Sequence, residues 1–109
     1  MGMFDEILVR VPLPIELPVD HREHWFQTKS LGCHLEYYEI TADGLLFLIQ
    51  HPGFRKPVAY TGEVRFYSQA SGIGKDESFR ETGWLECSAY FVAGKMQSMN
   101  LIQYREAVK

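Results

Sequence analysis

Four residues in the first third of the chain are of the types that bind zinc. His21 and His24 stand three residues apart, and Cys33 and His34 follow within a dozen residues. A structural zinc ion takes four such ligands in a tetrahedron, commonly as two close pairs. Adjacent residues on a strand point to opposite faces, however, so Cys33 and His34 are poorly arranged to share one ion. We therefore expect no bound metal and keep zinc as an alternative.

The two cysteines are the other candidates for chemistry. A cysteine nucleophile needs a histidine base that a third group holds in place. Cys33 lies at a predicted turn with His34 and His51 as candidate bases, but the sequence does not establish either contact. Cys87 lies on a predicted strand in which apolar and polar residues alternate, and it belongs to the apolar face. This position indicates a buried thiol. We expect two reduced thiols rather than a nucleophile.

No other catalytic signature is recognisable. The segment 71–76 resembles a phosphate loop, but a Walker motif needs a glycine where Gln69 stands and a hydroxyl residue where Asp76 stands. Carboxylates are numerous, and the solvent-facing side of antiparallel sheets accounts for them. We therefore expect no cofactor and favour a protein that is not an enzyme.

Two polar segments beside aromatic residues are candidates for contact with a partner or ligand. One follows the pair Trp25 and Phe26, and the other lies opposite the predicted core face of its strand. Exposed aromatic and arginine side chains are enriched at protein interfaces. The first segment has an alternative interpretation without a partner: it is the end of a strand, and its polar side chains bind nearby backbone groups. The candidate contact residues are Trp25, Gln27, Thr28, Lys29, Arg65 and Tyr67.

The elements that must position these residues have the two-residue period of β-strands. Strands are predicted over 7–11, 25–29, 35–41, 45–50, 61–68, 84–92 and 95–104. The turn Thr41-Ala42-Asp43-Gly44 predicts a hairpin over 35–50, whose return strand is apolar on both faces and so either central or covered by a partner. Prolines and glycines predict loops over 51–57 and 69–82. The fold class is mainly β with little helix: one domain over 1–109, an antiparallel sandwich or partly open barrel of six to seven strands.

Composition and charge narrow the class of protein. The chain has 109 residues, a formal net charge of −3 and 14% aromatic residues. Its cations are scattered and its balance is acidic, which makes nucleic acid an improbable partner. The first residues lack the pattern of a secretory leader, and the longest apolar run, 45–49, is too short to span a bilayer. We expect a cytoplasmic protein without a membrane partner.

Four short segments resemble a family of small uncharacterised proteins of bacteriophages and prophages. They are Met3-Phe4-Asp5, Phe26-Gln27-Thr28-Lys29, Tyr38-Glu39-Ile40-Thr41 and Gly62-Glu63-Val64-Arg65-Phe66-Tyr67. The resemblance implies a phage or prophage accessory protein in the cytoplasm of a bacterial host. It implies no activity, cofactor or catalytic residue.

Two functional hypotheses follow. The first is a non-enzymatic module that binds or inhibits a protein partner, with homo-oligomerisation as an option. The second is a small ligand-binding barrel, or a metal- or cysteine-dependent enzyme, with a site near residues 21–36. The second predicts a concavity in which polar groups of that segment converge.

Overall fold

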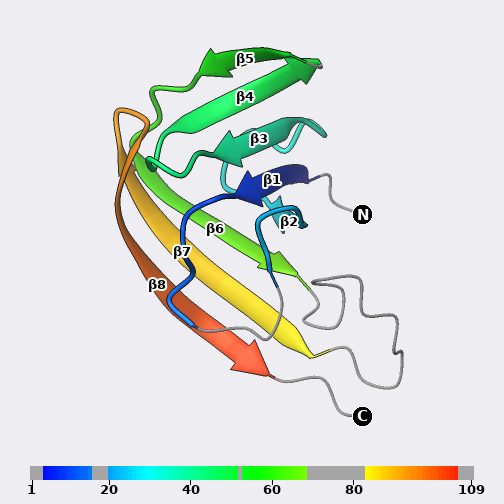
Figure 1. Cartoon of the computed structure of the whole chain (residues 1–109), viewed down its shortest axis with the longest axis vertical. Coiled ribbons are helices and arrows are strands. Elements are labelled where there is room, and N and C mark those ends of the chain that lie inside the picture. The colour runs from blue at the N-terminus through cyan, green and yellow to red at the C-terminus, as the bar shows by residue number, and fades with distance from the viewer. Residues whose placement is uncertain (1–3, 16–19, 52, 69–82, 106–109) are drawn as a thin grey trace.

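The computed structural model describes residues 4–15, 20–51, 53–68 and 83–105 as a single curved sheet of eight strands (Figure 1). The strands are β1 (Asp5–Val9), β2 (Trp25–Thr28), β3 (Tyr37–Ile40), β4 (Leu46–His51), β5 (Phe54–Pro57), β6 (Gly62–Ser68), β7 (Trp84–Val92) and β8 (Lys95–Arg105). Their order in the sheet is β5-β4-β3-β1-β2-β6-β7-β8. The predicted loop 69–82, with its glycine-rich segment 71–76, lies outside the described residues. None of the described segments forms a helix long and apolar enough to cross a membrane.

The mainly β prediction is confirmed, but its strand count and its purely antiparallel pairing are wrong. The structure is one sheet of eight strands that is not closed, where a sandwich or a partly open barrel of six to seven strands was predicted. It is also mixed, because β1 and β3 run parallel while the other neighbours are antiparallel. The parallel pair arises because β2 and β3 flank β1 on opposite sides, and two reversals of the chain restore the direction of β1.

The strand missed by the sequence prediction is β5. Gly53 takes a positive φ of 79° and turns the chain, so that β5 pairs antiparallel with β4. A proline has no amide to donate, yet Pro57 is tolerated because β5 is an edge strand. Proline and glycine therefore shape a hairpin here rather than the predicted loop.

The core lies on one face of the curved sheet, which we call the concave side, and the opposite face the convex side. Strand β7 shows why these residues form strands, since every second side chain is apolar and fully buried. The predicted burial of Cys87 is confirmed at 0% exposure, and burial raises the pKa of its thiol to about 11. The buried apolar cluster is Ile7, Val9, Val11, Phe26, Tyr38, Ile40, Leu46, Val64, Phe66, Leu85, Cys87, Ala89 and Phe91.

Two hairpin turns meet at one end of the sheet and hold its curvature. The Leu46 amide donates to the Gly94 carbonyl at 3.0 Å, and the Met96 amide donates to the Gly44 carbonyl at 2.8 Å. Both glycines have a φ of +83°, which side chains other than glycine rarely adopt. A Cβ on Gly94 would lie 2.2 Å from the Val58 carbonyl oxygen, so only glycine fits at this contact.

Candidate functional site

Alternation along the strands places a second set of side chains on the convex side, away from the core. Leu8 of β1 lies opposite Trp25 of β2 on one side and opposite Glu39 of β3 on the other. Glu39 in turn lies opposite Phe47 of β4. Side chains paired across neighbouring strands point to the same face. Four strands thus present one continuous row of side chains to the outside.

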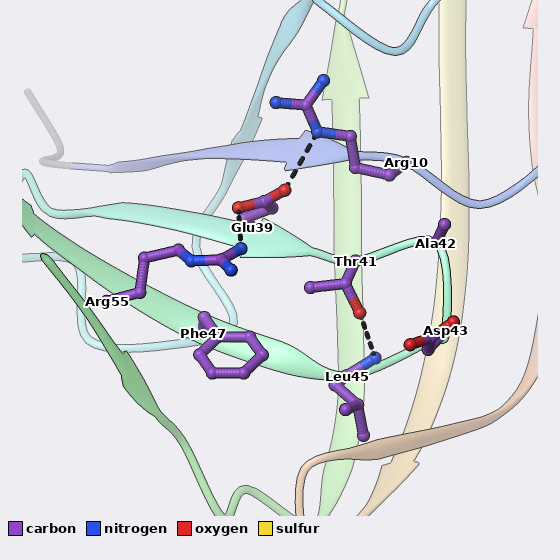
Figure 2. Close-up of a pocket in the computed structure, with 8 residues that line it drawn as sticks. All are labelled: Arg10, Glu39, Thr41, Ala42, Asp43, Leu45, Phe47 and Arg55. Atoms are coloured by element: carbon purple, nitrogen blue, oxygen red, sulfur yellow. Dashed lines mark hydrogen bonds and ion pairs between the residues drawn. The ribbon is translucent and has the colours of Figure 1, made fainter. Parts of the chain in front are cut away.

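At the centre of this row, Glu39 holds two arginines (Figure 2). Its Oε2 accepts a hydrogen bond from Nε of Arg10 at 2.9 Å, and its Oε1 accepts one from Nη1 of Arg55 at 2.9 Å. The Glu39 side chain is only 11% exposed, whereas Arg55 is 48% exposed. Because a buried carboxylate needs charged partners, the two arginines explain how Glu39 is tolerated there.

Arg10 is fixed by further contacts on its far side. Its Nη1 donates to the Glu23 carboxylate at 3.0 Å and to the Arg22 carbonyl at 3.1 Å. The hydrogen bond to Glu39 is the main reason that the pKa of Arg10 is raised, with Glu23 contributing less. Arg10 is therefore a rigid part of the surface. Arg55 donates to Glu39 alone among the described residues, and its side chain is about half exposed.

A surface pocket with a volume of about 420 Å³ lies beside this ion-pair cluster (Figure 2). The Arg55 guanidinium stacks over the Phe47 ring at 4.9 Å from its centroid, which gives one wall an aromatic and cationic character. The turn after β3 forms another wall, where the Thr41 hydroxyl accepts a hydrogen bond from the Leu45 amide at 3.1 Å. The lining residues are Arg10, Glu39, Thr41, Ala42, Asp43, Leu45, Phe47 and Arg55.

Two exposed aromatic rings extend this surface toward β2. The Trp25 and Tyr37 rings pack edge to face with centroids 5.2 Å apart, and their exposures are 37% and 48%. Between them on β1, Leu8 is only 7% exposed. We call this surface the outer patch, and it consists of Leu8, Arg10, Trp25, Tyr37, Glu39, Phe47 and Arg55.

The composition of the outer patch is better suited to binding than to catalysis. Both oxygens of Glu39 already accept guanidinium hydrogen bonds, which leaves this carboxylate poorly placed to take a proton from a substrate. The pocket lining contains no cysteine and no histidine. Large aromatic and arginine side chains are instead the residues that contribute most to protein–protein binding.

The predicted contact residues fall on two regions of the sheet. Trp25 belongs to the outer patch, and Gln27 and Lys29 are exposed on or next to β2. Thr28 is fully buried, and its hydroxyl donates to the Arg65 carbonyl at 2.7 Å, which ties β2 to β6. Arg65 lies on the convex side as expected from its strand.

The second region is formed by β6 and β7, where Arg65 lies between two carboxylates. Its guanidinium is 3.5 Å from Glu63 and 3.7 Å from Glu86. The Tyr67 ring stacks on Trp84 at 5.5 Å. Gln27 of β2 lies opposite Tyr67 of β6 on the same face, so this second region adjoins the outer patch through β2.

Three of the four residues considered for zinc each have a different hydrogen-bond partner, and the fourth is exposed. His21 donates to the Val11 carbonyl at 2.9 Å, and the Cys33 thiol donates to the Lys29 carbonyl at 3.3 Å. His34 is exposed. Among the described residues, no three potential ligands of histidine, cysteine, aspartate or glutamate type come together.

His24 packs inside the structure rather than in a cleft. Its Nε2 lies 2.7 Å from the Ser68 hydroxyl, and its ring packs edge to face on Phe26 at 4.9 Å. Burial lowers the pKa of His24, and the neighbouring charge of His21 lowers it further. The segment 21–36 does not line the described pocket, which lies instead over β1, β3, β4 and β5.

The loop that carries Cys33 and His34 is organised by Asp5. The Asp5 carboxylate is fully buried, and one oxygen accepts the amides of Gly32 and Cys33 at 3.0 and 2.8 Å. The other accepts the amides of His34 and Glu36 at 3.0 and 2.9 Å. Burial is the largest single influence and raises the pKa, but the four amide hydrogen bonds together outweigh it, so the pKa of Asp5 is lowered.

Sequence reasoning missed the centre of the outer patch. Arg55 was hidden because its segment was predicted to be a loop, and Arg10 had no neighbour in sequence that suggested a site. One signal was available: Glu39 is a charged residue between Tyr38 and Ile40 in a strongly apolar strand. Such a residue requires partners wherever its face is covered.

Comparisons of the chain with protein-family models, with curated proteins and with solved structures find no match.

Proposed function

We propose that this chain is a non-enzymatic protein-interaction module, an accessory protein of phage or prophage type that binds or inhibits a protein of its bacterial host. The outer patch is its contact surface. The observation that carries the proposal is that the exposed Trp25 and Tyr37 rings share one face of the sheet with the exposed Arg55 guanidinium, which stacks on Phe47.

The outer patch is proposed as the contact surface because a few residue types contribute most of the binding energy in protein interfaces. Tryptophan, tyrosine and arginine dominate such interfaces because they bury large areas and pair their polar groups at the same time. Here Glu39 fixes the direction of Arg55 before any partner arrives, so little side-chain entropy remains to be lost on binding. The partner surface that fits has a carboxylate against Arg55 and, several strands away, an apolar side chain against Trp25.

Affinity capture from a bacterial lysate, followed by binding measurements with the purified captured protein, tests this proposal. Trp25→Ala and Arg55→Glu are each expected to weaken binding by about 2 kcal/mol or more, roughly thirtyfold in Kd. Tyr90→Ala and Lys56→Glu are matched controls, because both residues are exposed and lie outside the outer patch. Their binding should match that of the wild type.

The opposite result is equally clear. A partner that binds all four variants with the wild-type affinity uses another surface, and the assignment of the outer patch is then wrong. Urea denaturation of each variant verifies that its fold is intact. Trp25 is partly exposed, so its replacement leaves the core unchanged. Arg55→Glu also removes a partner of Glu39, and Arg55→Gln, which adds no charge beside Glu39, separates a loss of binding from a loss of stability.

A small ligand is the second candidate, and the pocket beside Glu39 is the observation that favours it. Its test is ligand-observed NMR with a set of small carboxylates, comparing the wild type with Arg55→Glu. Binding that is lost in Arg55→Glu favours a ligand site there. The metal-dependent version of the hypothesis of a site near 21–36 is tested by elemental analysis of protein purified without added metal.

A further inference from the structure

The two edges of the sheet differ in a way that bears on self-association. Unpaired edge strands invite other strands to add, and proteins protect them with lysine, arginine and proline. The β5 edge carries Arg55, Lys56 and Pro57. The β8 edge, by contrast, contains neither a charged residue nor a proline between Lys95 and Arg105. The β8 edge therefore lacks protection by charge or proline, and its regular pairing with β7 is interrupted only by two irregularities, at Gln97 and Ile102.

In the described part of the chain, most of β8 has no neighbouring strand on the side away from β7. At its start, the Met96 amide donates to the Gly44 carbonyl, so this end is already paired. From Gln97 onward, no strand of the described ranges lies beside it on the side away from β7. Leu101 is opposite Cys87, so its side chain points toward the core side, yet it is 40% exposed. A neighbouring strand would cover this apolar surface.

The sequence of β8 identifies which strand fits. Its residue types read nearly the same in both directions from Asn100: Met99 matches Leu101, Gln97 matches Gln103 and Met96 matches Tyr104. Ser98 and Ile102 are the one mismatched pair. In a two-fold antiparallel pairing, each residue meets its counterpart from the other end of the same strand. Apolar residues then meet apolar ones, and amides meet amides.

We propose that β8 pairs with β8 of a second copy of this chain, antiparallel, about a two-fold axis at Asn100. Met99 of one copy lies opposite Leu101 of the other, on the core side of both sheets. The ladder covers the open part of the edge from Gln97 to Gln103. The outer patch lies at the other end of the sheet order and stays free, so this proposal and the proposed function fail independently.

Sedimentation equilibrium of the full chain tests the pairing. We expect a reversible monomer–dimer equilibrium at concentrations up to about 1 mM. Leu101→Lys places a charge against its counterpart near the axis and is expected to give a monomer throughout. Phe54→Lys is the matched control, because Phe54 is 49% exposed on the other edge, and it should dimerise like the wild type. A wild-type monomer at every concentration, or a Leu101→Lys dimer, overturns the proposal.

Disulfide trapping tests the position of the axis. Directly opposed residues of an antiparallel pair have Cα atoms 4.5–5.5 Å apart, within the range that a disulfide spans. In a Cys33→Ser background, Asn100→Cys should therefore form a cross-linked dimer on oxidation. Ser98→Cys should not, because the two copies of residue 98 would lie about 13 Å apart along the strands. Equal trapping at both positions, or none at Asn100→Cys, overturns this register.

Discussion

Replacing Asp5 by asparagine tests how one side chain orders the loop between β2 and β3. The carboxylate has enough lone pairs to accept all four amides of the loop. Asparagine has a single acceptor oxygen, and its NH₂ group would direct two hydrogens at two of those amides. The substitution keeps the size of the side chain but replaces one of its two acceptor oxygens by a donor group. We therefore expect Asp5→Asn to behave as a loss of the carboxylate and not as a conservative change.

The magnitude follows from the number of bonds and from the exposure of the loop. Each hydrogen bond to a charged group contributes roughly 1.5–3 kcal/mol, and at least two are lost. Water can replace part of this loss, since Gly32, His34 and Glu36 are exposed. We expect the free energy of unfolding to fall by about 3 kcal/mol, which lowers the urea midpoint by about 2 M at a slope of about 1.5 kcal/mol/M. Tryptophan fluorescence reports the transition.

The pH dependence gives a second, independent signature. The pKa of Asp5 is lower in the folded state than in the unfolded chain, so the carboxylate stabilises the fold above the unfolded value of about 3.9. This contribution disappears as the pH falls through the folded pKa. The difference in urea midpoint between the wild type and Asp5→Asn should therefore have its full size at pH 7 and become smaller below about pH 4.

Glu6→Gln is the matched control, because it removes the adjacent carboxylate from the convex side and should change stability by less than about 0.5 kcal/mol. The reasoning is refuted if Asp5→Asn and Glu6→Gln have the same urea midpoint at pH 7. It is also refuted if the effect of Asp5→Asn is unchanged at low pH.

Three further predictions concern the turn, the thiols and a buried histidine. Gly94→Ala should destabilise the fold by about 3 kcal/mol or more in urea denaturation, whereas Gly53→Ala should cost only about 1 kcal/mol, because a Cβ there meets no atom within 4 Å. A thiol reagent should modify the partly exposed Cys33 in the native protein but reach Cys87 only after unfolding; fast native labelling of both would contradict the described core. Burial lowers the pKa of His24, so stability should fall as the pH drops below about 6.5, and His24→Gln should flatten that part of the urea-midpoint profile.

The parts of the fold predicted from sequence are those with a local cause. The alternation of β7 and the turn before Gly44 act over a few residues, so the strand, its core face and the hairpin of β3 and β4 were all recognisable. The neighbours of β1 have no such local cause. Alternation shows which side of a strand is buried but not which strand lies beside it or in which direction, so the parallel pair was missed.

The candidate site illustrates the same limit. Glu39 meets Arg10 and Arg55, which are 29 and 16 residues away in the sequence. Nothing local brings these three together; the order of the strands does. Trp25 was recognisable because a large aromatic residue at a polar position of a strand is visible without any knowledge of its neighbours.

The place of β1 in the sheet also has a consequence for how the chain folds. The hairpin of β4 and β5 and the meander from β6 to β8 can each form between neighbours in sequence. In the sheet order β1, with β2 and β3 on its two sides, lies between them, and the turns at Gly44 and Gly94 join them a second time at one end. Because the contacts of β1 are distant in sequence, we expect the sheet to be completed only when β1 is inserted, after these local units have formed. Damage to β1 would therefore open the sheet in its middle and leave the two parts joined at the turns alone.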